Sequence, residues 1–248
     1  MYNKIGEFEF IAEPFKVDYT GHLTFGALGN HMLNCAGMHA DQRGFGISML
    51  NDKNNCTWVL SRMVIELSKM PYQYEKFTIE TWVDSVSKFF TNRNFALFDN
   101  EGNNMGYAKS IWAMIVLESR KPMNMLDIHG GKIAEYALPD RDCPIEGPGR
   151  VRVKATEPSM SLKARYSDID INGHFNSMRY IEHILDLFPL ENFKESRIRR
   201  FEIAFVTESH YGDTLDYYLD DNGDNQYAVE IKNHETGESV CRSLVVFS

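Results

Sequence analysis

The sequence is poor in paired cysteines, in long apolar runs and in positive charge. Its four cysteines are scattered, and none stands in a C-x-x-C pair that would support a zinc or redox site. No stretch approaches the roughly 18 apolar residues of a membrane-spanning helix. Lysine and arginine number 26 against 35 acidic residues, the reverse of what a nucleic-acid-binding protein normally shows. We therefore expect no metal, no cofactor, no membrane span and no nucleic-acid partner.

The first residues also lack the features of a targeting segment. Residues 1–10 are mixed and acidic, with no apolar run after basic residues and no enrichment in arginine and serine. Scattered cysteines are more simply interpreted as reduced thiols than as a disulfide scaffold. Both observations lead us to expect a cytoplasmic protein. A hydrophobic content of 43% is enough to build a core.

What the sequence does contain is one structural pattern repeated. A first strand is predicted within residues 7–19 and is broken at Pro14. Small and apolar residues then recur at helical spacing over residues 27–43. Antiparallel strands should follow at 56–67, 77–83, 89–98 and 107–117. After a stretch rich in proline and glycine, with a short helix near 131–137, the pattern returns as a strand at 161–166, a helix at 177–188, and strands at 197–209, 214–220, 226–233 and 239–247.

A helix followed by an antiparallel run, found twice, predicts an α+β fold of two tandem hot-dog units. In each unit a long antiparallel sheet would wrap a helix. We expect an N-terminal unit at residues 1–140, a linker at 141–157 and a C-terminal unit at 158–248.

The densest group of polar residues lies in residues 166–177, directly before the second predicted helix. Asp168 fits a structural turn, and Asn176 fits a helix cap. The corresponding loop before the first helix carries Gly21 and His22, but we interpret it as lacking the Asp-x-Asn-x-His pattern. His22 is then structural. The polar residues of the second copy should therefore serve chemistry rather than merely form the loop, and the first unit should provide a pocket.

Residues 170–176 with Tyr180 and Ile181 resemble the D-x-N-x-H-x-N-x-x-x-Y-I/V segment of acyl-ACP thioesterases. Residues 205–209 resemble the aromatic-x-x-Glu segment of this family, and residues 58–62 resemble its W-v-x-x-R strand. The resemblance implies hydrolysis of the thioester between a fatty acyl chain and acyl carrier protein (ACP). It also implies an acyl-chain pocket in the N-terminal unit and leaves a homodimer open. Carried over by position, the catalytic residues are Asp170, Asn172, His174 and Glu208.

These residue types suit thioester hydrolysis. On an extended segment Asp170, Asn172 and His174 would project to one side. Glu208, expected on a strand, is the preferred base for water, with His174 assisting, and a backbone N–H at the following helix could bind the oxyanion. A direct-water route and a covalent route both remain open. Ser209 stands where plant-type members carry cysteine, so a scheme that needs a thiol there fails in this chain.

Three other functions also fit the sequence: an acyl-CoA thioesterase, a non-catalytic acyl-binding protein and, less well, a hydroxyacyl dehydratase. The basic residues Lys163, Arg165 and 197–200 fit either a docking patch for the acidic ACP or solvated strand charges equally well.

Overall fold

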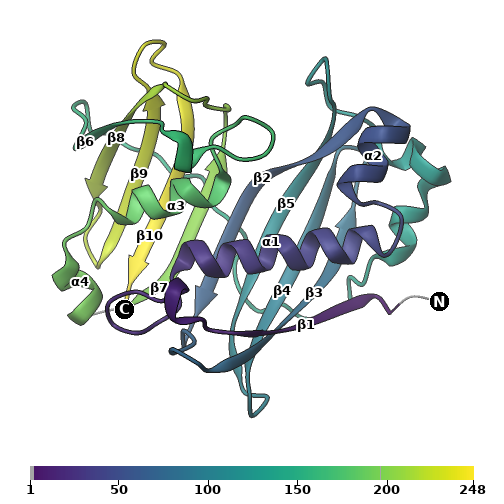
Figure 1. Ribbon diagram of the computed structural model, residues 1–248, viewed down its shortest axis with the longest axis horizontal. Coiled ribbons are helices and arrows are strands. Elements are labelled where there is room, and N and C mark those ends of the chain that lie inside the picture. Colours follow the sequence, from purple (N-terminus) through teal and green to yellow (C-terminus); the bar gives the residue numbers. More distant parts are fainter. Residues whose placement is uncertain (1–2, 196) are drawn as a thin grey trace.

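The structure is a computed structural model that describes residues 3–195 and 197–248. Ten strands form one continuous antiparallel sheet in the order β1-β3-β4-β5-β2-β7-β10-β9-β8-β6. The helices α1 and α3 lie on the same face of this sheet (Figure 1). The predicted arrangement of helices wrapped by a long antiparallel sheet is confirmed.

The elements follow the predicted order. The strands of the first half are β1 (Ile5–Ile11), β2 (Cys56–Leu67), β3 (Lys76–Val86), β4 (Phe90–Asp99) and β5 (Asn104–Val116). Those of the second half are β6 (Met160–Lys163), β7 (Ile198–Phe205), β8 (Thr214–Asp221), β9 (Gln226–Asn233) and β10 (Ser239–Phe247). The helices are α1 (Phe25–Asp41), α2 (Ile47–Asn54), α3 (Ser177–Leu185) and α4 (Leu190–Glu195), with 3-10 turns η1 (Pro14–Lys16), η2 (Met125–Tyr136) and η3 (Tyr166–Asp168).

The sheet order reveals the repeat. The first half reads β1-β3-β4-β5-β2, and the second half, read from the opposite edge, runs β6-β8-β9-β10-β7 in the matching order. The two halves meet where β2 pairs with β7, with Ile65 opposite Phe201. This pairing across the halves was not predicted, because it joins segments far apart in the chain and leaves no local pattern.

Helix α1 forms where the sequence predicts it. The Thr24 side chain accepts a hydrogen bond from the Ala27 N–H and so caps the helix N-terminus. The helix approaches α3 closely at Gly29, where an added Cβ would lie 2.2 Å from the Met178 sulfur. The small residues of α1 therefore allow the two helices to pack together under one sheet.

Two predicted strand ends were wrong, and two short helices were missed. The first strand ends at Ile11, because Pro14 begins a 3-10 turn. Helices α2 and α4 were not predicted, since eight and six residues are too short to show a clear helical period. Strand β7 ends at Phe205 rather than at residue 209. Among the described residues, no helix combines the length and apolar character needed to cross a membrane.

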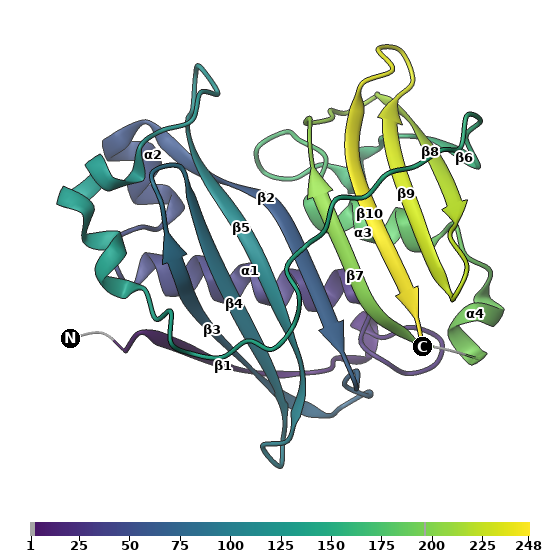
Figure 2. The same cartoon turned by 180° about the vertical axis from the view of Figure 1, so that it is seen from behind.

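The segment at 141–157 crosses the face of the sheet opposite the helices (Figure 2). The Gly149 N–H donates to Glu202 Oε2 of β7 at 2.6 Å, and the Ala155 N–H donates to Asp220 Oδ1 of β8 at 2.9 Å. The segment is thus fastened to the second half of the sheet. The division into units at 1–140, 141–157 and 158–248 stays a prediction.

Arg200 joins both halves of the sheet to this segment. Its guanidinium pairs at 2.7 Å with Glu66 of β2 and at 2.7 Å with Glu202 of its own strand. Its Nη2 also donates at 3.1 Å to the backbone carbonyls of Glu146 and Gly147. Arg200 is therefore structural.

Of the two interpretations left open for the basic residues, these contacts favour separate charges over one docking patch. Arg200 is held by these contacts. Lys163 lies on β6 at the sheet edge, and β10, β9 and β8 separate it from β7. The remaining exposed charges of this set do not gather at one place on the sheet.

We expect Arg200→Met to lower the free energy of unfolding by about 2–4 kcal/mol, because it leaves the buried Glu202 carboxylate without its cation. Arg199→Met is the matched control, since Arg199 is exposed on the same strand and should change stability by less than about 0.5 kcal/mol. Urea unfolding followed by circular dichroism measures both. Equal stability of the two variants would contradict this role of Arg200.

Candidate active site

The polar loop before α3 is paired with the loop that follows β7. The Phe175 N–H donates to the Ser209 carbonyl at 2.8 Å, and His174 forms an isolated antiparallel bridge with His210. Backbone hydrogen bonds therefore fix the position of His174 relative to Glu208, which lies between β7 and this bridge. Glu208 is in a loop, so the expectation that it lies on a strand was wrong.

Asp170 holds its own loop in a tight turn. Its Oδ1 accepts hydrogen bonds from the N–H groups of Asn172 at 2.8 Å and His174 at 3.2 Å. Gly173 has φ +79°, a left-handed conformation that favours glycine. The expectation of an extended segment was wrong, because this turn folds the chain back. Asp170, Asn172 and His174 nevertheless line the same cavity.

The loop before α1 has the same turn. Asp18 Oδ1 accepts from the N–H groups of Thr20 at 2.8 Å and His22 at 3.2 Å. The Asp18 N–H donates to the His22 carbonyl at 2.7 Å, and the Asp170 N–H donates to the His174 carbonyl at 2.8 Å. The interpretation that the first loop lacks this aspartate was wrong. Asp170 is thus needed to form the loop, whatever else it does.

Two of the four candidate catalytic positions differ between the copies. Thr20 takes the place of Asn172. The Leu23 N–H donates to the Pro71 carbonyl at 2.9 Å, as the Phe175 N–H does to Ser209, so Met70 takes the place of Glu208. Met70 is buried. The carboxamide and the carboxylate therefore distinguish the second copy from the first.

His174 and Glu208 form the centre of the candidate site. His174 Nε2 lies 3.6 Å from Glu208 Oε2. Arg120 reaches Glu208 Oε1 from the turn after β5, in the other half of the sheet. Burial and the positive charge of Arg120 lower the pKa of His174, and the Asp170 carboxylate opposes this shift. The imidazole is therefore neutral at neutral pH and able to accept a proton.

Neighbouring polar residues have structural roles. Asn176 caps α3, its Oδ1 accepting from the Met178 N–H at 2.8 Å, as predicted. Asp168 is buried, accepts from Arg179 at 3.3 Å and lies 3.2 Å from His183 Nε2, which confirms its structural interpretation. Ser209 is buried and does not line the cavity, so its hydroxyl is poorly placed as a nucleophile.

The cysteines offer no alternative nucleophile. All four are free and buried. Burial raises the pKa of Cys35 to about 12 and that of Cys143 to about 11, and it also raises the pKa values of Cys56 and Cys241. A thiolate is therefore scarce at neutral pH. Among the described residues no group of histidine, cysteine and carboxylate side chains is arranged to hold a metal ion.

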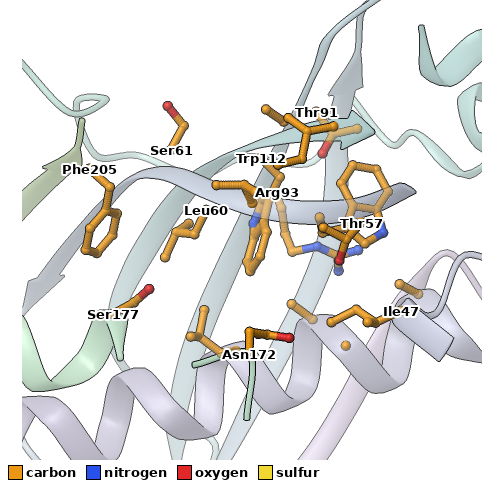
Figure 3. A pocket seen from close by; sticks show the side chains of 18 of the residues that line it. Ile47, Thr57, Leu60, Ser61, Thr91, Arg93, Trp112, Asn172, Ser177 and Phe205 are labelled. Carbon is orange, nitrogen blue, oxygen red and sulfur yellow. The ribbon is translucent and has the colours of Figure 1, made fainter. Parts of the chain in front are cut away.

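The candidate residues open into a cavity of about 1030 Å³ that extends under the first half of the sheet. Asp170, Asn172, His174 and Glu208 all line it. Figure 3 shows Asn172 and Ser177 in its lower part, with Leu60, Trp112 and Arg93 above them. A polar group and an apolar chamber are thus parts of one space, which suits a ligand with a reactive head and a long apolar body.

Two cavity residues were missed in the sequence. Arg120 lies in a turn 88 residues before Glu208, and no local pattern connects them. Arg93 stands between Asn92 and Asn94 in the polar first half of β4, so nothing in the local sequence distinguishes it from a solvated strand residue.

Comparison with known proteins agrees with this geometry. The model of the acyl-ACP thioesterase N-terminal domain matches residues 7–129, and that of the C-terminal domain matches residues 152–247. The chain belongs to the acyl-ACP thioesterase family.

The structure is similar to solved members of the acyl-ACP thioesterase family. A crystal structure of an acyl-ACP thioesterase from Bacteroides thetaiotaomicron has a TM-score of 0.93 and 56% identity, covering 99% of this chain and 98% of that one. The 12:0-ACP thioesterase of Umbellularia californica shares the fold, with a TM-score of 0.85 and 19% identity over 100% of this chain and 98% of that one.

Curated plant members are more distant and longer. Oleoyl-acyl carrier protein thioesterase 2 of Arabidopsis thaliana, a chloroplastic protein, is 25% identical over 84% of this chain and 60% of its own length. The chain spans 46% to 64% of the length of the first such relatives.

We expect Arg120→Met to raise the pKa of His174, because it removes a nearby positive charge and releases Glu208 to the imidazole. Titration of the His174 ring signals by NMR, assigned with a His174→Gln variant, measures the shift. Lys121→Met, in the same exposed turn, is the matched control and should leave the pKa where it is. An identical titration curve in the Arg120 variant and the parent protein would contradict the coupling.

Proposed function

We propose that the protein hydrolyses the thioester of fatty acyl-ACP and releases free fatty acid and holo-ACP, as a step in fatty acid biosynthesis. The observation that carries this proposal is the single cavity that joins the His174–Glu208 pair to an apolar chamber. Membership of the acyl-ACP thioesterase family supports the choice of substrate.

In the proposed reaction a water molecule attacks the thioester carbonyl carbon. The neutral His174 and the Glu208 carboxylate together accept its proton, and the same proton passes to the sulfur as the carbon–sulfur bond breaks. Water therefore supplies the new carbon–oxygen bond, and the thiol leaves protonated. The side chain of Asn172 and the N–H of Ser177 at the N-terminus of α3 stabilise the negative charge on the carbonyl oxygen. Asp170 holds the loop that presents Asn172 and His174.

We place the acyl chain in the part of the cavity under the first half of the sheet, as the sequence suggested. The side chains there that support this are largely apolar and aromatic. They include Leu33, Phe45, Trp58, Leu60, Trp112 and Ile133.

ACP is the proposed partner. Large apolar side chains are exposed on the two loops that carry the candidate residues, and we propose that ACP contacts them. They are Tyr166, Ile171, Val206 and Tyr211.

We also propose a cytoplasmic protein, supported by four free cysteines. The homodimer considered from the sequence stays a prediction that the molar mass in solution will test.

We expect His174→Ala and Glu208→Gln each to lower kcat on acyl-ACP at least about 100-fold, because each removes a group that moves the proton. The duplicated loop provides the matched control, His22→Ala, which should keep kcat within about twofold. Rates are measured as release of the ACP thiol. Full activity in both site variants would overturn the assignment.

Asp170→Ala and Asp18→Ala separate loop formation from chemistry. Both remove the two backbone hydrogen bonds of the turn, and Asp18→Ala also removes the bond from the Thr20 hydroxyl, so both should lower the melting temperature, Asp18→Ala at least as much as Asp170→Ala. Only Asp170→Ala should also lower kcat on acyl-ACP. Equal kcat in the two variants would show that the turn at residues 170–174 does not matter for catalysis.

Product analysis on matched acyl-ACP and acyl-CoA thioesters tests the carrier. We expect kcat/KM to be higher by about tenfold or more for the ACP thioester, because only ACP contacts the surface around the cavity. A preference for CoA would favour the acyl-CoA thioesterase alternative. Retained ligand without thiol release would favour an acyl-binding protein, and an enoyl product would favour a dehydratase.

A further inference from the structure

Arg93 places a positive charge inside the apolar half of the cavity. It lies on β4 and is 7% exposed. Arg93 and Thr91 are two residues apart on one strand, so they share a face, and both line the cavity. The Arg43 guanidinium, which also lines the cavity, adds a second positive charge at this end.

The described partners of the Arg93 guanidinium are neutral. Its Nη1 donates to Thr81 Oγ1 at 3.1 Å, and the Thr81 hydroxyl in turn donates to the Asn94 carbonyl at 3.0 Å. Nη1 also lies 3.2 Å from His39 Nδ1. His39 Nε2 lies 3.1 Å from the Lys4 carbonyl, which can only accept, so Nε2 carries the proton and Nδ1 accepts from Arg93.

Among the described residues, no carboxylate pairs with the Arg93 guanidinium. Burial and the two arginines lower the pKa of His39 to about 3, so it stays neutral. Burial and the charge of Arg43 also lower the pKa of Arg93 to about 10, which still leaves it protonated. The hydrogen bonds of the Arg93 guanidinium to Thr81 and His39 both use Nη1. A buried cation without an anionic partner is costly, and an oxygen atom from a ligand would offset that cost.

The position of Arg93 matches the far end of an acyl chain. Leu60 of β2 is opposite Trp112 of β5, and Trp112 is opposite Thr91 of β4, so these side chains form a row across the sheet. Phe205, at the end of β7, lies beside the candidate catalytic loop. Three strand spacings separate β7 from β4, roughly 14 Å. In Figure 3 the Arg93 guanidinium extends toward Thr57, on the side away from Phe205.

We propose that Arg93 binds an oxygen atom carried by the acyl chain near its end remote from the thioester, so that chains bearing a hydroxyl or carboxylate there are preferred substrates. This inference rests on the proposed function, because it takes the thioester to lie at His174 and Glu208. A plain hydrocarbon end would face the guanidinium without a hydrogen-bonding group and would be accepted less well.

The test compares acyl-ACPs of equal length that end in a methyl group, a hydroxyl or a carboxylate. The parent protein, Arg93→Met and Arg93→Lys are measured, with Arg62→Met as the matched control because Arg62 is exposed on β2 and does not line the cavity. The parent should favour the oxygen-bearing chains in kcat/KM. Arg93→Met should reduce that preference at least about tenfold, with the loss in KM, and Arg93→Lys should keep part of it.

A binding measurement keeps the inference separate from the proposed function. The methyl esters of the fatty acids with the same three ends serve as ligands in thermal unfolding of the same proteins, because an ester in place of the thioester leaves no carboxylate at the head of the chain. The esters with an oxygen-bearing remote end should raise the melting temperature of the parent more than the plain ester does, and Arg93→Met should abolish this difference. An unchanged difference in Arg93→Met would overturn the inference. Absence of thiol release from every acyl-ACP, with the difference in melting temperature present, would overturn only the proposed function.

Discussion

The pairing of β2 with β7 is the constraint on which the rest of the structure depends. It turns two five-stranded halves into one sheet, and Arg200 fastens that join by binding Glu66, Glu202 and two carbonyls of the connecting segment. Because the join fixes one half against the other, the loop with His174 opens onto a chamber built from the opposite half. Neither half alone contains both the polar group and the apolar space.

The same join explains the electrostatics around His174. Arg120 belongs to the first half, yet it reaches Glu208 in the second and contributes to lowering the pKa of the imidazole. The charge of Arg120 therefore acts on the His174 imidazole because the assembled sheet brings the two halves together. At the other end of the chamber, Arg93 shows the opposite situation, a cation whose described partners are neutral. The cavity is thus polar at both ends and apolar between them.

Much of the fold and part of the site could be predicted from the sequence because those features are local. The β2 boundaries and the cap at Asn176 depend on neighbouring residues. Arg120 and the β2–β7 pairing could not be predicted, since they depend on contacts between distant segments. The turn at Asp18 is different. Asp18 stands three residues before Gly21 and His22, the same spacing as Asp170 before Gly173 and His174, so the sequence contained that signal and it was overlooked.

The shared turn at Asp18 and Asp170 has an evolutionary consequence. Since the aspartate accepts the same two backbone N–H groups in both turns, a duplicated unit can exchange its carboxamide for threonine and its carboxylate for methionine without losing the backbone shape. A copy freed from selection for reactivity can then diverge in the residues of its chamber while its scaffold is preserved. In the first half of the chain, new ligand preferences can then arise without changing the residues that carry out the proposed reaction.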